Sequence, residues 1–210
     1  MGYRLYGRRQ TGSMAIEAAL GFCPADWTLI DTPRPKTEAE RTALLQINPR
    51  GQVPILVHPD GTVITEGPAI LSHLAGAFPT ANLAPAPGSS VRAWHDRWLA
   101  YHQANVYEGM LRELFPDRYT LDPAGGPAVA AAATDYVRRH FSIFEAELAR
   151  RADTAFLCGT GPSILDIYLW MLCFWIDASW LAITCPRFAA HWQRMRALPA
   201  LIPVEKAHFG

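Results

Sequence analysis

A proline at the start of a short strand constrains this chain more than any other feature of its sequence. The run Val53-Pro54-Ile55-Leu56 follows the turn residues Asn48-Pro49-Arg50-Gly51, which predicts a strand that begins at the proline. Proline has no N–H group to donate to a sheet. The Asp60-Gly61 pair predicts a hairpin turn, with Thr62-Val63-Ile64 as the return strand. We therefore expect the Val53 backbone to face something other than the sheet.

An acidic residue marks the helix that follows this hairpin. Glu66 precedes Gly67, a predicted N-cap, and Pro68 suits the first helical position. Free amide groups at a helix start can hold a carboxylate, and the Glu66 side chain can meet an ammonium group beside it. The alternative interpretation of both segments is an edge hairpin with a trans proline and one capped helix.

The two segments resemble the glutathione-binding half of the cytosolic glutathione transferases, which is a thioredoxin-like domain. The resemblance implies a cis Val53-Pro54 bond and a Val53 backbone that pairs with the cysteinyl part of glutathione as an added strand. Gln52 and Val53 would border the glycyl and cysteinyl parts. Glu66 and the Gly67 amide would hold the γ-glutamyl end.

Two further positions are compared with the same family. Most members have serine where this chain has Gly67, and the lost hydroxyl would cost about 1.5–3 kcal/mol if it met a charged carboxylate. Lys36 matches a basic position that often meets the glycyl carboxylate, and a solvated lysine is the equal alternative.

The order of predicted elements gives the fold class. Residues 1–78 predict an α/β, thioredoxin-like domain in the order βαβαββα, with strands at 3–6 and 27–30 and helices at 13–20 and 38–47. Three prolines and one glycine make residues 79–90 a linker. Residues 91–210 predict an all-α helical bundle, with long helices over 91–116 and 129–148 and others over 163–181 and 186–197.

One apolar run has the length of a membrane span. Ile164–Ile183 contains Asp166 and Asp177, so a helix buried in a soluble domain explains it better. Ser163 and Asp166 form a predicted capping box at its start, which resembles the box that opens the buried helix of glutathione transferases. Its role is structural.

Composition excludes several classes of function. The 210 residues carry a formal net charge of +0, which leaves no electrostatic footprint for nucleic acid or a membrane. The 4 cysteines lie far apart without a Cys-x-x-Cys pair, so we expect no disulfide framework and no metal site. With no signal peptide evident, we expect a cytoplasmic protein.

The resemblance implies a homodimer that presents the glutathione thiolate to an electrophile. A free thiol has a pKa of about 8.5, so half ionisation at pH 7 requires about 2 kcal/mol of preferential thiolate stabilisation. The donor should stand near the end of the first strand. Ser13, Thr11 and Tyr6, in that order, are our candidates, and Ser13 as a plain N-cap is the alternative. The cysteine of the cysteine-using bacterial class is absent, because Gly12-Ser13 stands in its place.

The electrophile pocket should lie between the two domains against the first long helix. Five residues there could form an apolar wall with hydroxyl groups, although ordinary core is the alternative for each. They are Tyr101, Tyr107, Met110, Leu111 and Tyr119.

The leading hypothesis is a glutathione transferase that conjugates glutathione, its co-substrate, to small hydrophobic electrophiles or catalyses a related reaction. The alternative is a catalytically silent relative that serves as a binding or interaction protein, which Gly67 favours. A thioredoxin-type reductase would need a redox cysteine after the first strand, where the chain has none. Neither a nucleotide-binding glycine loop nor a Gly-x-Ser-x-Gly elbow is present.

Overall fold

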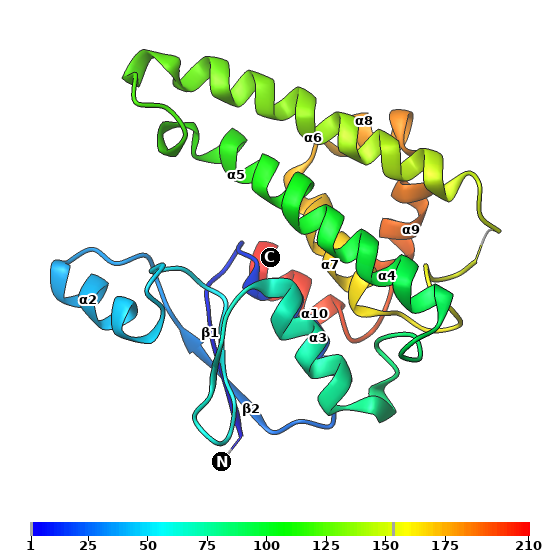
Figure 1. Ribbon diagram of the computed structural model, residues 1–210, viewed down its shortest axis with the longest axis horizontal. Coiled ribbons are helices and arrows are strands. Elements are labelled where there is room, and N and C mark those ends of the chain that lie inside the picture. The colour runs from blue at the N-terminus through cyan, green and yellow to red at the C-terminus, as the bar shows by residue number, and fades with distance from the viewer. Residues whose placement is uncertain (1, 153) are drawn as a thin grey trace.

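The protein begins with a four-stranded mixed sheet and continues with helices alone, the arrangement expected from the sequence (Figure 1). The structure is a computed structural model that describes residues 2–152 and 154–210. The sheet order is β2-β1-β3-β4, with β1 parallel to β2 and β3 antiparallel to both of its neighbours. The strands are β1 (Tyr3–Gly7), β2 (Trp27–Asp31), β3 (Ile55–Val57) and β4 (Val63–Ile64).

Three helices flank this sheet, namely α1 (Ser13–Phe22), α2 (Glu38–Ile47) and α3 (Gly67–Ala77). Successive side chains of a strand point to opposite faces, so β1 divides its residues between two cores. Leu5 joins the large core with α1 and α3, whereas Tyr6 packs on a small cluster that contains Leu44 of α2 and Ile55. Tyr6 is therefore directed to the α2 face.

The helical part is built on a long rod. Helices α4 (Ser90–Tyr101) and α5 (Glu108–Leu114) are joined by a π-helical segment, His102–Tyr107, and α6 (Gly126–Leu148) runs beside them (Figure 1). Every residue of α7 (Ile164–Leu172) is buried. Helices α8 (Ala178–Thr184), α9 (Pro186–Arg196) and α10 (Ile202–Phe209) complete the chain. Among the described residues, no helix combines the length and apolar character needed to cross a membrane.

The predicted capping box opens α7. The Asp166 carboxylate accepts from the Ser163 amide at 2.8 Å, while the Ser163 hydroxyl accepts from the Asp166 amide. The second carboxylate oxygen accepts from the Leu157 amide at 2.9 Å and lies 2.8 Å from Nε2 of His191. The box thus also ties the preceding loop and α9 to the central helix.

Several predicted boundaries were wrong. The single helix expected over 163–181 stops at Leu172, and α8 begins separately because the Asp177 side chain accepts from the Trp180 amide as an N-cap. Helix α10 was not predicted. Ser13 and Gly67 are the first helical residues of α1 and α3 and not their N-caps, which are Gly12 and Glu66.

Candidate functional site

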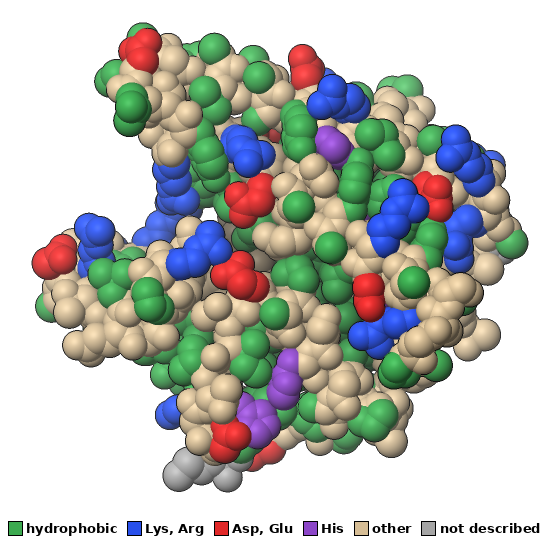
Figure 2. All heavy atoms as spheres, in the orientation of Figure 1, with side chains coloured by type: hydrophobic (Ala, Val, Ile, Leu, Met, Phe, Trp, Pro, Cys, Tyr) green, Lys and Arg blue, Asp and Glu red, His purple; other side chains and the backbone are tan. Residues whose placement is uncertain are grey.

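A cleft of about 320 Å³ lies between the sheet layer and the α4–α5 rod. Loops at the ends of β1, β2 and β4 and the segment before β3 supply one wall, and the rod supplies the other. Figure 2 shows the notch at which these two parts of the molecule face each other, with Lys and Arg side chains on both sides.

Val53 and the proline after it, Pro54, belong to the lining of this cleft. The peptide bond between them is cis. The adjoining Gln52 also lines the cleft, and its carbonyl accepts from the side chain of Asn48 at 2.8 Å. This bond ties Gln52 to Asn48 and holds the turn before β3 in place.

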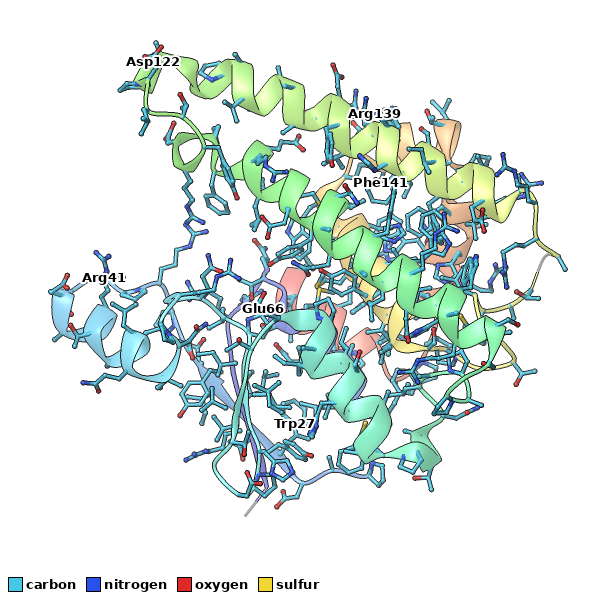
Figure 3. The ribbon with its side chains drawn as sticks, in the orientation of Figure 1. Trp27, Arg41, Glu66, Asp122, Arg139 and Phe141 are labelled. Carbon is cyan, nitrogen blue, oxygen red and sulfur yellow. The ribbon has the colours of Figure 1, made fainter. Side chains whose placement is uncertain are left out.

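Glu66 reaches the same cleft from the start of α3 (Figure 3). Its φ of 66° is in the left-handed region, which costs a non-glycine residue about 1–3 kcal/mol and is concentrated at functional sites. The Glu66 carboxylate accepts from the Arg50 guanidinium at 2.9 Å and makes no capping bond to α3. The amides that open α3 at Gly67 and Ala69 are therefore left without a side-chain cap.

The three candidate thiol donors lie in different surroundings. Ser13 is fully buried, and its hydroxyl lies 3.2 Å from a Glu17 carboxylate oxygen and 3.0 Å from the Arg8 carbonyl. Tyr6 faces α2. Thr11 lines the cleft, and its hydroxyl donates to the Arg8 carbonyl at 2.9 Å. Of the three, only Thr11 is exposed to a ligand in the cleft.

Helix α10 holds the loop that carries Thr11. The Gln10 amide donates to Nδ1 of His208 at 3.0 Å, so Nε2 carries the ring proton and faces a Glu17 oxygen at 3.0 Å. Gln10 has a φ of 55°, another left-handed residue at the site. The buried chain Gln10–His208–Glu17–Ser13 therefore fixes the turn between β1 and α1.

The rod presents residues spaced by four along its length. Side chains three or four apart share one face of a helix, which explains why this set meets the cleft together. The set is Gln103, Tyr107, Leu111 and Phe115. Gln103 also accepts from the hydroxyl of the buried Tyr168, which joins the lining from α7. The π-helical segment carries Gln103 and Tyr107, and such segments are frequent at functional sites.

Tyr107 approaches the start of α1 closely. A Cβ atom placed on Gly12 would lie 3.0 Å from the Tyr107 hydroxyl oxygen, so the glycine makes room for the phenol. Burial and the nearby Glu108 raise the pKa of Tyr107 on balance, against the opposing effect of the Gly12 amide. The phenol thus keeps its proton at neutral pH and can act as a donor.

Other predicted residues lie outside this cleft. Tyr101 bonds to His140 of α6, Met110 is buried in the core, and Tyr119 packs under the Arg112 guanidinium. Lys36 is exposed, and Arg34 of the same loop lines the cleft in its place. Within the described residues, no group of three or more His, Cys, Asp or Glu side chains is placed to hold a metal ion.

Several lining residues were missed by sequence reasoning. Arg8, Arg34, Gln103, Arg118 and Tyr168 belong to the lining and come from five separate segments. Spacing by four from Tyr107 would have found Gln103 and Phe115. The arginines had no such signal, because isolated arginines are ordinary surface residues.

Comparisons with known proteins agree with this geometry. Residues 15–77 match the model of the glutathione S-transferase N-terminal domain, and residues 127–202 match that of the C-terminal domain. The chain is 28% identical to glutathione S-transferase GstA of Escherichia coli O157:H7 over 201 residues, covering 93% of this chain and 94% of that protein.

Solved structures show the same fold. A sphingomonad glutathione S-transferase complexed with glutathione is 30% identical, with a TM-score of 0.78 and 98% of each chain covered. A glutathione transferase homologue from Sulfitobacter with bound glutathione is 22% identical, with a TM-score of 0.84 and 97% of each chain covered. At that identity the second likeness concerns the fold alone.

Proposed function

The chain belongs to the glutathione S-transferase family, and we propose that it binds glutathione in the cleft and joins it, through its sulfur, to a small electrophile. The observation that supports this proposal is the convergence of Val53, which precedes a cis proline, and Glu66 in one cleft. An extended tripeptide can pair with Val53 as an added strand. Its terminal ammonium then meets Glu66, and the carboxylate beside it meets the open amides of α3.

The sulfur of a tripeptide held in this way is directed to the start of α1. Thr11 and the Gly12 amide lie there on one side, and the Tyr107 hydroxyl lies on the other. We infer that Tyr107 donates a hydrogen bond to the thiolate, because its raised pKa keeps it protonated. A hydrogen bond to a charged group contributes about 1.5–3 kcal/mol, and the α1 terminus adds about 0.3–1 kcal/mol, so together they supply the 2 kcal/mol needed.

The alternative function is a silent relative that binds glutathione without turnover. Two observations favour it, since Gly67 lacks a side-chain donor and the Thr11 hydroxyl is already bonded to a backbone carbonyl. A homodimer is part of both proposals, and light scattering of the purified protein in solution tests it.

Retention on immobilised glutathione, together with an aromatic halide assay, distinguishes the two functions. The transferase is retained and conjugates the halide, whereas the silent relative is retained without turnover of any electrophile. Glu66→Gln should weaken retention, and Glu38→Gln on the exposed start of α2 is the matched control. A wild-type protein that is not retained would contradict both.

A further inference from the structure

Three arginines in the cleft have no acidic partner. Arg8, Arg34 and Arg118 all belong to the lining, and within residues 2–152 and 154–210 no ion pair joins any of them to a carboxylate. By contrast, Arg50 of the same cleft is paired with Glu66 at 2.9 Å. The Nε atom of Arg8 is buried and has no hydrogen-bond partner among the described residues. Like charges collected without partners favour the binding of an anion.

Two of these arginines stack on the same aromatic ring, that of Phe115. The Arg118 guanidinium carbon lies 4.2 Å from the centre of the Phe115 ring, and that of Arg34 lies 4.9 Å from it. Arg34 comes from the loop after β2, whereas Phe115 and Arg118 follow α5, so the contact crosses the mouth of the cleft. Stacking on an aromatic ring holds a guanidinium in place but does not neutralise it. Burial and the positive charge of Arg34 lower the pKa of Arg8 on balance, against the opposing charge of Asp31.

The thiolate of glutathione carries a net charge of −2 and balances the cleft, whereas the thioether formed from it does not. Four arginines against two glutamates give the lining side chains a net charge of +2. A glutathione thioether has two carboxylates and one ammonium, hence a net charge of −1. The conjugate of an electrophile that carries one further carboxylate has a charge of −2, which matches the cleft. Arg34 and Arg118 adjoin Phe115, on the wall assigned to the electrophile, whereas Arg50 is already paired with Glu66.

We propose that the second substrate is an anion, a carboxylate on an aromatic or otherwise apolar body, and that Arg8, Arg34 and Arg118 around Phe115 receive its charge. The inference rests on the proposed glutathione-dependent function and deepens it by naming the class of electrophile. Tyr107, Leu111 and Phe115 contact the body of the substrate, and the arginines orient its acidic end toward the mouth of the cleft.

Two probes of the same shape test the proposal, 4-chloro-3-nitrobenzoate and its neutral amide, 4-chloro-3-nitrobenzamide. In each reaction the glutathione sulfur forms a bond to the ring carbon, chloride leaves with the electron pair of the C–Cl bond, and the thiol proton passes to the buffer. Dividing kcat/KM by the uncatalysed rate of each probe removes their difference in reactivity. We expect an advantage of about tenfold for the carboxylate at low ionic strength, which shrinks as salt screens the exposed arginines.

Arginine variants test which residues cause the preference for the carboxylate probe. Arg118→Gln and Arg34→Gln should each lower the carboxylate-to-amide ratio several-fold, whereas Arg41→Gln, the same change on α2 outside the lining, should preserve it. Equal acceleration of the two probes, or a ratio unaffected by both cleft variants, would overturn the proposal.

A binding measurement separates this inference from the proposed function. Titration calorimetry compares the glutathione conjugates of the two probes as ligands. Tighter binding of the carboxylated conjugate without turnover of either probe would support the anion site and contradict the transferase. Turnover of both probes with equal affinity for the conjugates would retain the transferase and overturn the anion site. Absence of both binding and turnover would overturn both.

Discussion

At the scale of single residues, the Tyr107 and Ser13 hydroxyls differ in whether they can reach a ligand in the cleft. Ser13 stands where the family resemblance places a thiol donor, yet it is fully buried and bonded to Glu17. Tyr107 is distant from Ser13 in the sequence, but it lies on the opposite wall of the cleft and approaches the start of α1 at Gly12. The half-buried phenol keeps its proton and can donate a hydrogen bond to a ligand.

We expect Tyr107→Phe to raise the pKa of the bound glutathione thiol by about 1–2 units, the equivalent of one hydrogen bond to a charged group. The ultraviolet absorbance of the thiolate, followed against pH in the binary complex, measures it. Tyr136→Phe removes a hydroxyl that bonds to Asn105 between α6 and the rod, and it serves as the control. Identical titrations for Tyr107→Phe and the wild type would exclude Tyr107 as the donor.

A second residue prediction concerns Gly67. A Cβ atom placed there would meet only Tyr168, at an ordinary 3.7 Å, so a serine fits without displacement. Its hydroxyl would supply the donor that most of the family has, and a hydrogen bond to a carboxylate contributes about 1.5–3 kcal/mol. We expect Gly67→Ser to tighten glutathione binding about tenfold by calorimetry. Gly67→Ala adds the Cβ without the donor, and an equal gain in that variant would show that the hydroxyl is not responsible.

At the scale of elements, the last helix positions the loop that carries Thr11 at the cleft. Helix α10 contributes His208, whose two ring nitrogens meet the Gln10 amide and the Glu17 carboxylate. Because Gln10 is in the left-handed region, this contact selects the turn that exposes Thr11 to the cleft. Helix α10 thus positions the loop between β1 and α1.

His208→Leu should leave the Gln10 amide without its acceptor and the buried Glu17 carboxylate with the Ser13 hydroxyl as its remaining partner, and an unsatisfied buried polar group costs about 1–3 kcal/mol. Urea unfolding measures the loss of stability, and hydrogen exchange should show faster exchange confined to residues 8–12. Lys206→Ala changes an exposed residue of the same helix and should leave both measurements unchanged. Unaltered exchange at residues 8–12 in His208→Leu would contradict the positioning role.

At the scale of the whole molecule, stability should depend on pH through buried histidines. His102 is fully buried between the rings of Trp98, Tyr101 and Phe144, and burial lowers its pKa to about 4. The unfolded chain binds a proton at this site below about pH 6.5, whereas the folded chain binds it only below about pH 4. Protonation therefore favours the unfolded state increasingly as the pH falls through this window.

We expect the free energy of unfolding to decrease from pH 6.5 to pH 4. In His102→Phe, which keeps an aromatic ring among its neighbours, the slope should be shallower by up to about 1.4 kcal/mol per pH unit, the effect of one proton. Urea unfolding at several pH values measures both slopes. Parallel curves for the two proteins would show that His102 does not contribute.

The order of elements, and the residues of the hairpin and of the next helix start that line the cleft, could be predicted from sequence because their signals are local. Val53, Pro54 and Glu66 lie within fourteen positions and follow turn and helix-start chemistry. The break between α7 and α8 was missed because continuous apolar composition hides an N-cap at Asp177. The arginines, Tyr168 and His208 were missed because only the tertiary fold brings these distant segments together.

A crystal structure of the protein with glutathione tests the central claim most directly. The account predicts that the cysteinyl N–H and C=O groups pair with the Val53 backbone at about 2.7–3.2 Å, with the γ-glutamyl ammonium beside the Glu66 carboxylate. Glutathione bound elsewhere, or bound in the cleft with the Val53 backbone unpaired, would contradict it.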